Sequence, residues 1–417
     1  MPCIYFQEVS VPLVSVVIPA YCSSTYLDEC LTSIEGQSFS DVEIIVVDDA
    51  SPDDTSSVIR CHAGRDHRIE PLFLNENRGT LAARKAGVLA SAGDYVLLVD
   101  QDDELDRDAI RKLVEYAVAH PADIYHFSAK VLATGDAAAG AREGMEGFLT
   151  PPARRIEGPD ILRTQLLESG GFDWHVHHKM FGGDFARRCY SLASDERLVL
   201  SDDIYMSFIL CSQAQSYEAI PNAPWYIYHL GRGETYGKAL DLGSYGRLAS
   251  ADGRALLLAR SYVEGPSAPE RDDWGERLDS LRDRLAFHAM NEWMDSLPAS
   301  LKDEGCDIAL EYLPADAVCG ELYRFVRDRA YALLQQQAGS AKEAKALEWD
   351  ALHFLALARK AEKASEFDGS NGRYREMRDI ALCHLRDCGL VGERRTACAP
   401  SGLVHRLTSV IRRAMGR

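Results

Sequence analysis

The chain lacks a long apolar run and lacks an excess of basic residues. No window approaches 18 consecutive apolar residues, so the sequence predicts no membrane-spanning helix. The first residues, MPCIYFQEVSVPLVSVVIPAY, do not include the basic start of a signal peptide. The formal net charge of −18 argues against a general nucleic-acid binder, because such proteins carry a basic face.

Cysteine pairs spaced as CxxC are also absent. The eleven cysteines are scattered and odd in number, which argues against a disulfide framework and against a zinc ribbon. We therefore expect reduced thiols and a cytoplasmic protein. With 417 residues, of which 46% are hydrophobic, the chain is long enough for two domains.

Short β-branched runs alternate with stretches of helical length from Val14 to about Ser128. The runs are VSVVI, VEIIVV, IEPLFL, DYVLLV and ADIYHFS. This alternation predicts an α/β fold, with a mostly parallel sheet flanked by helices. Residues 135–158 are rich in Gly, Ala and Pro and are predicted to form a loop or hinge. From residue 241 to about 390, helical periodicity predicts an all-helical second domain.

Three of the predicted strands end in polar or turn-forming residues: VVIPAY (16–21), VVDDASPDDT (46–55) and LLVDQDD (97–103). Ligands of parallel sheets bind at the carboxyl ends of strands, so these segments are expected to converge. In an extended chain Asp100 and Asp102 point the same way, about 6 to 7 Å apart. At an effective dielectric of about 20 their charges repel by roughly 3 kcal/mol. Either water screens a solvated strand end, or the pair binds a divalent cation.

Four motifs, in this order, resemble those of the family 2 glycosyltransferases. They are IPAY, DDASPDDT, NRGTLAARKAG and DQDD. The likeness covers residues 13 to 130 strongly and 170 to 235 weakly, and it implies the GT-A nucleotide-sugar binding fold. Ala50, Lys85 and Gln101 depart from the family's usual residues, but none of these changes removes a carboxylate.

The resemblance implies a nucleoside diphosphate sugar as donor, with UDP favoured, and Mn²⁺ or Mg²⁺ as cofactor. The residues that it assigns to the nucleotide sugar are Pro19, Ala20, Tyr21, Asp48, Asp49, Arg84, Asp100 and Gln101. Asp102 and Asp100 are the expected metal ligands, and His229 is a further candidate ligand. Arg84 could instead lie on a solvated helix face, and His229 could be a packed core histidine.

The family's second acidic motif is matched by SDDIYMSF, which implies Asp203 as general base and Asp202 in the neighbouring acidic position. The alternative is an ordinary helix start after Ser201. Trp174 and Lys179 are similar to family residues near the acceptor. The segment also carries the histidines His175, His177 and His178, whose spacing matches no HExxH zinc pattern.

The implied function is a metal-dependent, inverting glycosyltransferase that acts on a glycan or lipid-linked glycan hydroxyl in bacterial cell-envelope polysaccharide synthesis. One alternative is a sugar-nucleotide pyrophosphorylase, although VVIPAYCSS lacks the glycines of that enzyme's phosphate loop. A non-catalytic glycan-assembly scaffold is another, and it would have lost some of the acids.

The sequence suggests three regions. Residues 1–240 form the expected catalytic domain, with a nucleotide-sugar half (1–130) and an acceptor half (131–240). Residues 241–398 form the helical domain. Residues 399–417 are expected to form a basic amphipathic helix that binds either an anionic membrane surface, at the inner face of the plasma membrane, or protein.

Overall fold

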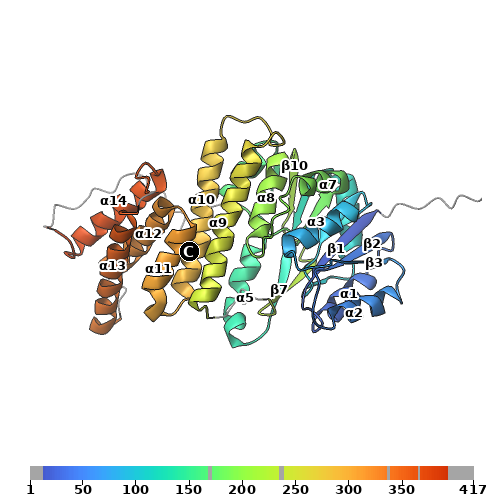
Figure 1. Cartoon of the computed structure of the whole chain (residues 1–417), viewed down its shortest axis with the longest axis horizontal. Coiled ribbons are helices and arrows are strands. Elements are labelled where there is room, and N and C mark those ends of the chain that lie inside the picture. Colours follow the sequence, from blue (N-terminus) through green and yellow to red (C-terminus); the bar gives the residue numbers. More distant parts are fainter. Residues whose placement is uncertain (1–12, 168–170, 234–238, 336–338, 365–366, 393–417) are drawn as a thin grey trace, which may run out of the picture. The chain divides into compact units, whose positions relative to one another are not determined.

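A computed structural model describes residues 13–167, 171–233, 239–335, 339–364 and 367–392 (Figure 1). The predicted helix at residues 399–417 lies outside the described residues. Within the described ranges, no helix combines the length and the apolar character that crossing a bilayer requires.

An eight-stranded mixed sheet forms the centre of the N-terminal part. Its order is β3-β2-β1-β4-β9-β6-β10-β8. The strands are β1 (Val14–Ala20), β2 (Val42–Asp48), β3 (Ile69–Phe73), β4 (Tyr95–Leu98), β6 (Ile124–Phe127), β8 (Arg155–Glu157), β9 (Lys179–Gly182) and β10 (Ser216–Ile220). β1 to β4 pair in parallel, as predicted, whereas β9 is antiparallel to both β4 and β6. A smaller sheet has the order β5-β11-β7, with β5 (Glu104–Leu105), β7 (Ala129–Ala133) and β11 (Tyr226–Leu230).

Alternate residues of the central strands face two separate cores. On β1, Val17 belongs to a core that includes α3, and Val16 and Ile18 belong to a core that includes α1. We call these the α3-side core and the α1-side core. Burial on both faces explains why the strands read as near-continuous apolar runs. Figure 1 shows α3 on one side of the sheet and α1 and α2 on the other.

Helices flank the sheet and make up the C-terminal part, which confirms the predicted fold class. The N-terminal helices are α1 (Leu27–Glu35), α2 (Thr55–Ala63), α3 (Thr80–Ala90), α4 (Ala109–Ala119), α5 (Asp136–Phe148), α6 (Asp160–Leu166), α7 (Gly183–Ser191) and α8 (Asp202–Gln213). The later helices are α9 (Leu242–Glu264), α10 (Trp274–Asp295), the 3₁₀ helix η1 (Ala299–Leu301), α11 (Lys302–Tyr312), α12 (Ala315–Leu334), α13 (Ala341–Ala361) and α14 (Gly372–Asp387).

Helix α5 occupies the segment for which a loop was predicted, so that prediction is wrong. Ala141, Met145 and Leu149 recur at intervals of four residues and belong to or pack against the α1-side core. Gly140, Gly144 and Gly147, which suggested a loop, face open space. They lower the helix propensity of the segment but do not prevent its apolar side from packing. The apolar stripe therefore decides the structure of this segment.

The chain divides into two compact units. The first extends to Leu285 and includes Asp295–Leu301, and the second contains Ala286–Met294 and the residues from Lys302 onward. The predicted boundary after residue 240 differs from this division, because α9 contributes residues such as Leu256 to the α3-side core. Ser201 before α8 also donates a hydrogen bond to Asp252 of α9 at 2.5 Å.

The second unit has an aromatic core of its own. Trp293 is fully buried and stacks on Phe325 with ring centroids 5.8 Å apart. Phe354 of α13 meets the same indole edge-on at 5.7 Å. Because α13 and α14 both pack on α12, the second unit has the helical character that the sequence predicted.

Candidate active site

Three neighbouring strand ends form one edge of the large sheet. β1 lies between β2 and β4, and all three run in parallel, so the residues that follow them meet at the same edge. Tyr21 follows β1, Asp49 follows β2, and Asp100 follows β4 closely. The structure thus brings together the segments that were expected to converge.

The carboxylate of Asp49 binds the start of helix α3. It accepts hydrogen bonds from the backbone N–H groups of Arg78 (2.8 Å) and Gly79 (2.7 Å). Burial raises the pKa of Asp49, and these two amides oppose the shift. Asp48 is also buried and accepts from the N–H of Ser51 at 3.0 Å. Both acids shape the turn after β2, and their contact with a nucleotide base stays a prediction.

Gln101, in the segment after β4, makes hydrogen bonds to the backbone at the end of β1. Its Oε1 accepts from the N–H of Tyr21 at 2.7 Å, and its Nε2 donates to the carbonyl of Tyr21 at 3.3 Å. Pro19 and Ala20 are buried within β1, whereas Tyr21 is 43% exposed. Of these three residues assigned to the nucleotide sugar, Tyr21 is therefore the one with an exposed side chain.

Arg84 of α3 lies at the centre of the acidic residues. Its Nη2 donates to Asp100 at 2.6 Å, and its Nη1 donates to Asp202 at 2.7 Å and to Asp203 at 3.0 Å (all Oδ atoms). Burial opposes the charge of this guanidinium, but Asp203, Asp100 and Asp202 outweigh it and hold the pKa of Arg84 well above its usual value. Arg84 is only 3% exposed, so its geometry fits a link between acids better than direct contact with a nucleotide.

Asp202 and Asp203 open helix α8 without a conventional cap. Leu200 and Ser201 have positive φ angles of 68° and 55°, and Ser201 makes no side-chain cap. The side chain of Asp202 is 7% exposed and that of Asp203 is 22% exposed. Burial raises the pKa of Asp202 to about 7, although Arg84 opposes the shift. Asp203 is the more accessible acid of the pair.

The acids after β4 differ in their surroundings. Burial, followed by repulsion from Asp100, raises the pKa of Asp102 to about 6. A nearby cation would relieve that repulsion, so Asp100 and Asp102 fit the expected divalent metal in chemistry. Asp103 is instead a buried anchor that accepts from the Tyr226 hydroxyl and from the N–H of His229, both at 2.8 Å. Sequence reasoning missed this anchor.

His229 and Lys179 make contacts that their predicted roles did not include. The Nε2 of His229 lies 2.7 Å from Glu104, so this ring atom is engaged with a carboxylate. Lys179 is buried, and its ammonium forms an ion pair with Asp173 at 3.0 Å. Trp174 is half-buried, and the guanidinium of Arg284 lies 4.9 Å from its ring.

The segment before β9 nevertheless touches the acidic centre. The N–H of Val176 donates to Oδ1 of Asp203 at 3.1 Å. The ring of His177 stacks on Tyr226 with centroids 4.8 Å apart. The same Tyr226 hydroxyl accepts from the N–H of Asp100 at 3.1 Å. These contacts connect residues 173–178 to Asp203 directly and to Asp100 through Tyr226.

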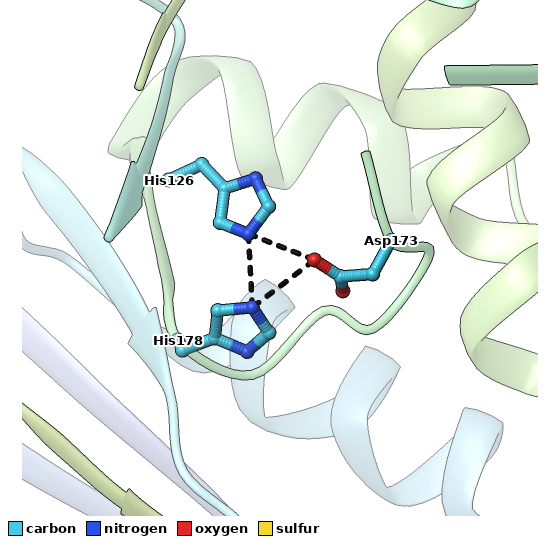
Figure 2. A group of neighbouring side chains, drawn as sticks. All are labelled: His126, Asp173 and His178. Carbon is cyan, nitrogen blue, oxygen red and sulfur yellow. Dashed lines mark hydrogen bonds and ion pairs between the residues drawn. The ribbon is translucent and has the colours of Figure 1, made fainter. Parts of the chain in front are cut away.

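His126, Asp173 and His178 form a buried polar group beside that segment (Figure 2). Nε2 of His126 lies 2.9 Å from Oδ2 of Asp173 and 2.9 Å from Nε2 of His178. Burial lowers the pKa of His126 to about 4 and that of His178 well below its usual value. The sequence drew attention to His178 but not to its two partners, because His126 is 52 residues away and matches no motif.

Comparison with protein families finds a match in the N-terminal region. The family model for "Glycosyl transferase family 2" matches residues 15–158. The succinoglycan biosynthesis protein ExoO of Rhizobium meliloti (strain 1021) is 28% identical over 312 residues, which cover 73% of this chain and 84% of ExoO. The uncharacterized glycosyltransferase EpsJ of Bacillus subtilis (strain 168) is 36% identical over 114 residues, which cover 27% of this chain and 33% of EpsJ. For EpsJ and four other bacterial glycosyltransferases, the match spans between 16% and 43% of the relative's length.

Among solved structures, TarS of S. aureus (residues 1–349) in complex with UDP-GlcNAc is similar in fold. Its TM-score is 0.53 at 17% sequence identity, with 86% of this chain and 95% of that chain covered. The complex of the same TarS fragment with UDP gives a TM-score of 0.51 at 15% identity, with 84% of this chain and 90% of that chain covered. At these identities the likeness concerns the fold, and it agrees with the predicted GT-A type.

Proposed function

We propose that the chain is a metal-dependent, inverting glycosyltransferase of family 2, whose family model matches residues 15–158. It transfers a sugar from a nucleoside diphosphate to a hydroxyl of a glycan or lipid-linked glycan. One observation carries the proposal: the guanidinium of Arg84 bonds both Asp100 after β4 and Asp203 of α8. Asp100, which we assign to the donor, and Asp203, the candidate base, are thereby both held by the guanidinium of Arg84.

UDP is the nucleotide that we propose for the donor. TarS, which has a similar fold, has been solved with UDP and with UDP-GlcNAc, and this supports the choice. Tyr21 offers an exposed ring against which a base can stack, in front of the buried Pro19 and Ala20. Asp48 and Asp49, which we also assign to the nucleotide, lie at the turn after the neighbouring strand β2.

Asp100 and Asp102 are the residues that we assign to Mn²⁺ or Mg²⁺. Both ions prefer oxygen ligands, and the raised pKa of Asp102 indicates a carboxylate whose ionised form a cation would stabilise. When bound, such a cation supplies positive charge to the departing diphosphate. His229 is left out of this ligand set because Glu104 engages its Nε2.

Asp203 is the base that we propose for the acceptor hydroxyl. Its bonds from Arg84 and from Val176 both end on Oδ1, so we assign the proton to Oδ2. In the transfer the acceptor oxygen bonds to the anomeric carbon while the bond from that carbon to the diphosphate oxygen breaks. The hydroxyl proton passes to Oδ2, and in-line displacement inverts the anomeric centre. Asp202 is more deeply buried and serves to fix Arg84.

The acceptor side is assigned to the segment before β9. We assign the half-buried Trp174 to the acceptor, whereas the buried Lys179 holds the segment through Asp173. We assign catalysis to residues 1–240 and leave residues 241–398 as a helical domain of other purpose. The basic segment 399–417 is proposed to bind an anionic membrane surface from the cytoplasmic side.

Bacterial envelope polysaccharide synthesis is the setting that we propose. ExoO is described as a succinoglycan biosynthesis protein, and another relative, TuaG of Bacillus subtilis (strain 168), as a putative teichuronic acid biosynthesis glycosyltransferase. TuaG is 35% identical over 105 residues. Such polymers are built from nucleotide sugars, in keeping with the proposed donor.

A thermal-shift panel of nucleotide sugars with and without Mn²⁺ tests the function. A ligand at 100 times its Kd stabilises the folded chain by about 2.7 kcal/mol, so a cognate donor should raise Tm clearly. We expect the largest rise with a UDP-sugar and Mn²⁺ together, and a smaller one for the Asp102→Asn variant. A panel in which no nucleotide sugar shifts Tm would contradict the proposal.

A further inference from the structure

Three metal-ligating atoms from separate parts of the chain converge in the α3-side core. His126 comes from β6, Asp173 from the segment after α6, and His178 from the residue before β9. Figure 2 shows the Nε2 atoms of both rings and one carboxylate oxygen turned toward one another. The three separations are 2.9, 2.9 and 3.3 Å. All three side chains are buried.

Hydrogen bonds alone do not account for this triangle. A neutral imidazole has one N–H, and a carboxylate has none. If both Nε2 atoms carry the proton, both donate to Asp173 and two N–H groups face each other at 2.9 Å. If only one of the two Nε2 atoms carries a proton, or if neither does, at least one of the three contacts joins two atoms that both present lone pairs. At most two of the three contacts are therefore hydrogen bonds, whereas a cation would use all three lone pairs.

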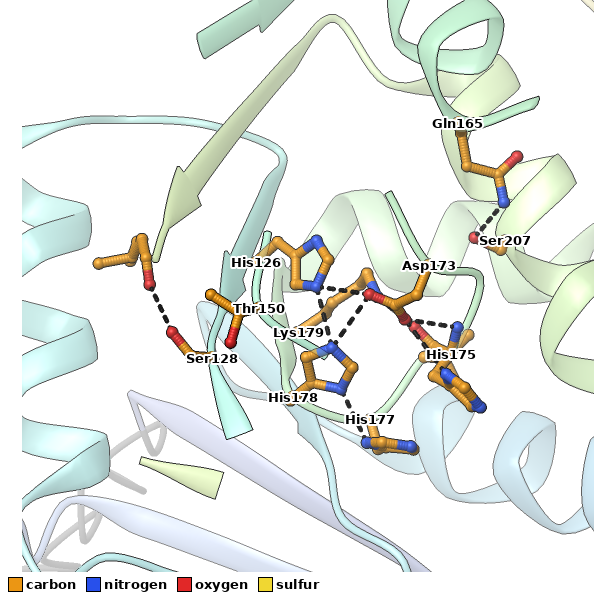
Figure 3. A network of polar contacts seen from close by, with 12 residues as sticks. His126, Ser128, Thr150, Gln165, Asp173, His175, His177, His178, Lys179 and Ser207 are labelled. Carbon is orange, nitrogen blue, oxygen red and sulfur yellow. Dashed lines mark hydrogen bonds and ion pairs between the residues drawn. The ribbon is translucent and has the colours of Figure 1, made fainter. Parts of the chain in front are cut away.

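Each of the three ligands is also anchored by its second polar atom, and Figure 3 shows His177 as the neighbour of His178. Nδ1 of His126 lies 2.7 Å from the Tyr217 hydroxyl, and Nδ1 of His178 lies 2.8 Å from Nδ1 of His177. Oδ1 of Asp173 is 3.0 Å from the Lys179 ammonium. Outer partners of this kind orient metal-binding histidines and carboxylates, and leave the inner atom free to bind.

The spacing of the inner atoms suits a transition metal. An ion about 1 Å out of their plane would lie about 2.0 to 2.1 Å from each, which matches zinc bonds to imidazole nitrogen and to carboxylate oxygen. Imidazole and carboxylate together suit Zn²⁺. All three groups are fully buried, so we assign the ion a structural role.

We propose that His126, Asp173 and His178 bind one Zn²⁺ ion as a structural metal site, separate from the acids after β4. The bound ion would fix the segment 173–178, whose Val176 N–H reaches Asp203 and whose His177 ring stacks on Tyr226. The inference does not rest on the proposed function, because metal content is measured without a turnover assay.

The test is elemental analysis of the full chain after loading with Zn²⁺ and gel filtration in metal-free buffer. We expect about one zinc per parent chain and at least a fivefold loss in both His126→Gln and His178→Gln. His175→Gln is the matched control, because the ring Nδ1 of His175 lies near Oδ1 of Asp173 and not near the Oδ2 atom that faces His126 and His178. Asp102→Asn should also retain zinc, which separates this site from the proposed donor-side cation. A parent chain without zinc, or equal retention in all variants, would overturn the proposal.

Two further measurements keep the proposal open to refutation if the histidine variants fail to fold. Co²⁺ added to the metal-free parent should give the visible absorption of tetrahedral cobalt, and no band would count against the site. Lys179→Met removes a buried positive charge 3.0 Å from Asp173. A zinc site should then release its metal to a chelator more slowly than in the parent. A metal-free polar network predicts instead that the variant binds no zinc and has a lower Tm.

Discussion

At the scale of single residues, Arg84 connects the two halves of the proposed mechanism. It is nearly buried, and its two terminal nitrogens bond three carboxylates. In the proposed mechanism Asp100 serves the donor and Asp203 serves the acceptor. Replacing Arg84 should therefore disturb both Asp100 and Asp203, whereas replacing one of these acids should disturb only its own side of the reaction.

Replacing Arg84 by Met should destabilise the fold, because the buried Asp202 loses its partner. Breaking a buried ion pair costs roughly 3–5 kcal/mol. We expect a loss of that order in urea unfolding at pH 8, where Asp202 is ionised. Lys85→Met is the neighbouring control, since Lys85 pairs with Asp195, whose side chain is 78% exposed. Exposed pairs contribute about 1 kcal/mol or less. Equal losses in the two variants would show that Arg84 has no special role.

Replacing Asp203 by Asn should separate binding from chemistry. Asn keeps the shape of the side chain but does not take up the acceptor proton. Turnover should fall by about 10² to 10⁴, the usual effect of losing a positioned general base, while donor affinity stays near that of the parent. Turnover and donor affinity are measured side by side, with Asp202→Asn for comparison. A collapse of turnover at Asp202 alone would move the base by one residue.

Cation binding should depend on the ionisation of Asp102, whose pKa is raised to about 6. The metal-binding form is the carboxylate, so Mn²⁺ affinity should be level above about pH 6.5 and fall about tenfold per unit below pH 6. The folded pKa exceeds the unfolded value of about 3.9, so this group lowers the free energy of unfolding as pH rises between those values. Calorimetry in buffers from pH 5 to 8 checks the affinity. A pH-independent Mn²⁺ affinity would exclude Asp102 as ligand.

At the scale of elements, the turn into α3 depends on a glycine. Gly79 has φ +88°, and a Cβ there would meet Val199 at 2.8 Å and the Leu198 carbonyl at 2.9 Å. Its N–H also donates to Asp49. Strain in such a backbone position costs of order 1–3 kcal/mol.

Gly79→Ala should therefore lower Tm and weaken donor binding together. Gly140→Ala in α5 is the control, because a Cβ there meets nothing within 4 Å. Removing a helix-interior glycine should stabilise by roughly 0.5–1 kcal/mol, so the control should raise Tm. If Gly79→Ala keeps the parental Tm, the turn is less constrained than its contacts indicate.

Local patterns were sufficient to predict β1 to β4, β6 and the strand-end acids. Apolar runs that alternate with helical stretches predict β1 to β4, and the parallel pairing of β1 with β2 and β4 brings the ends of these strands together. The ion pairs of Arg84 were not predictable, because Asp202 is 118 residues away and no local pattern reports such a distance. The triangle of His126, Asp173 and His178 was missed for the same reason. Helix α5 was missed because its glycines suggested a loop, whereas packing decided the segment.

At the scale of the whole molecule, charge is unevenly distributed along the chain. The net charge is −18, yet the last 17 residues, SGLVHRLTSVIRRAMGR, contain four arginines and no acid. Each basic residue near an anionic membrane contributes about 1 kcal/mol to binding. Acidic vesicles should therefore float the full chain but not a chain that ends at residue 400. Neutral vesicles are the control, and equal flotation of both chains would contradict membrane binding by this segment.

The position of β9 in the large sheet has a consequence for assembly during synthesis. β9 (179–182) lies between β4 (95–98) and β6 (124–127) in the sheet. The two earlier strands therefore do not pair with each other, and each pairs with β9 only after β9 has been synthesised. At 5–20 residues per second, the ribosome needs about 4 to 16 s to advance from residue 98 to residue 179. During that interval the edge of β4 is open to pairing with a wrong strand. The nascent chain is therefore most exposed to misassembly before the segment that carries His178 has been made.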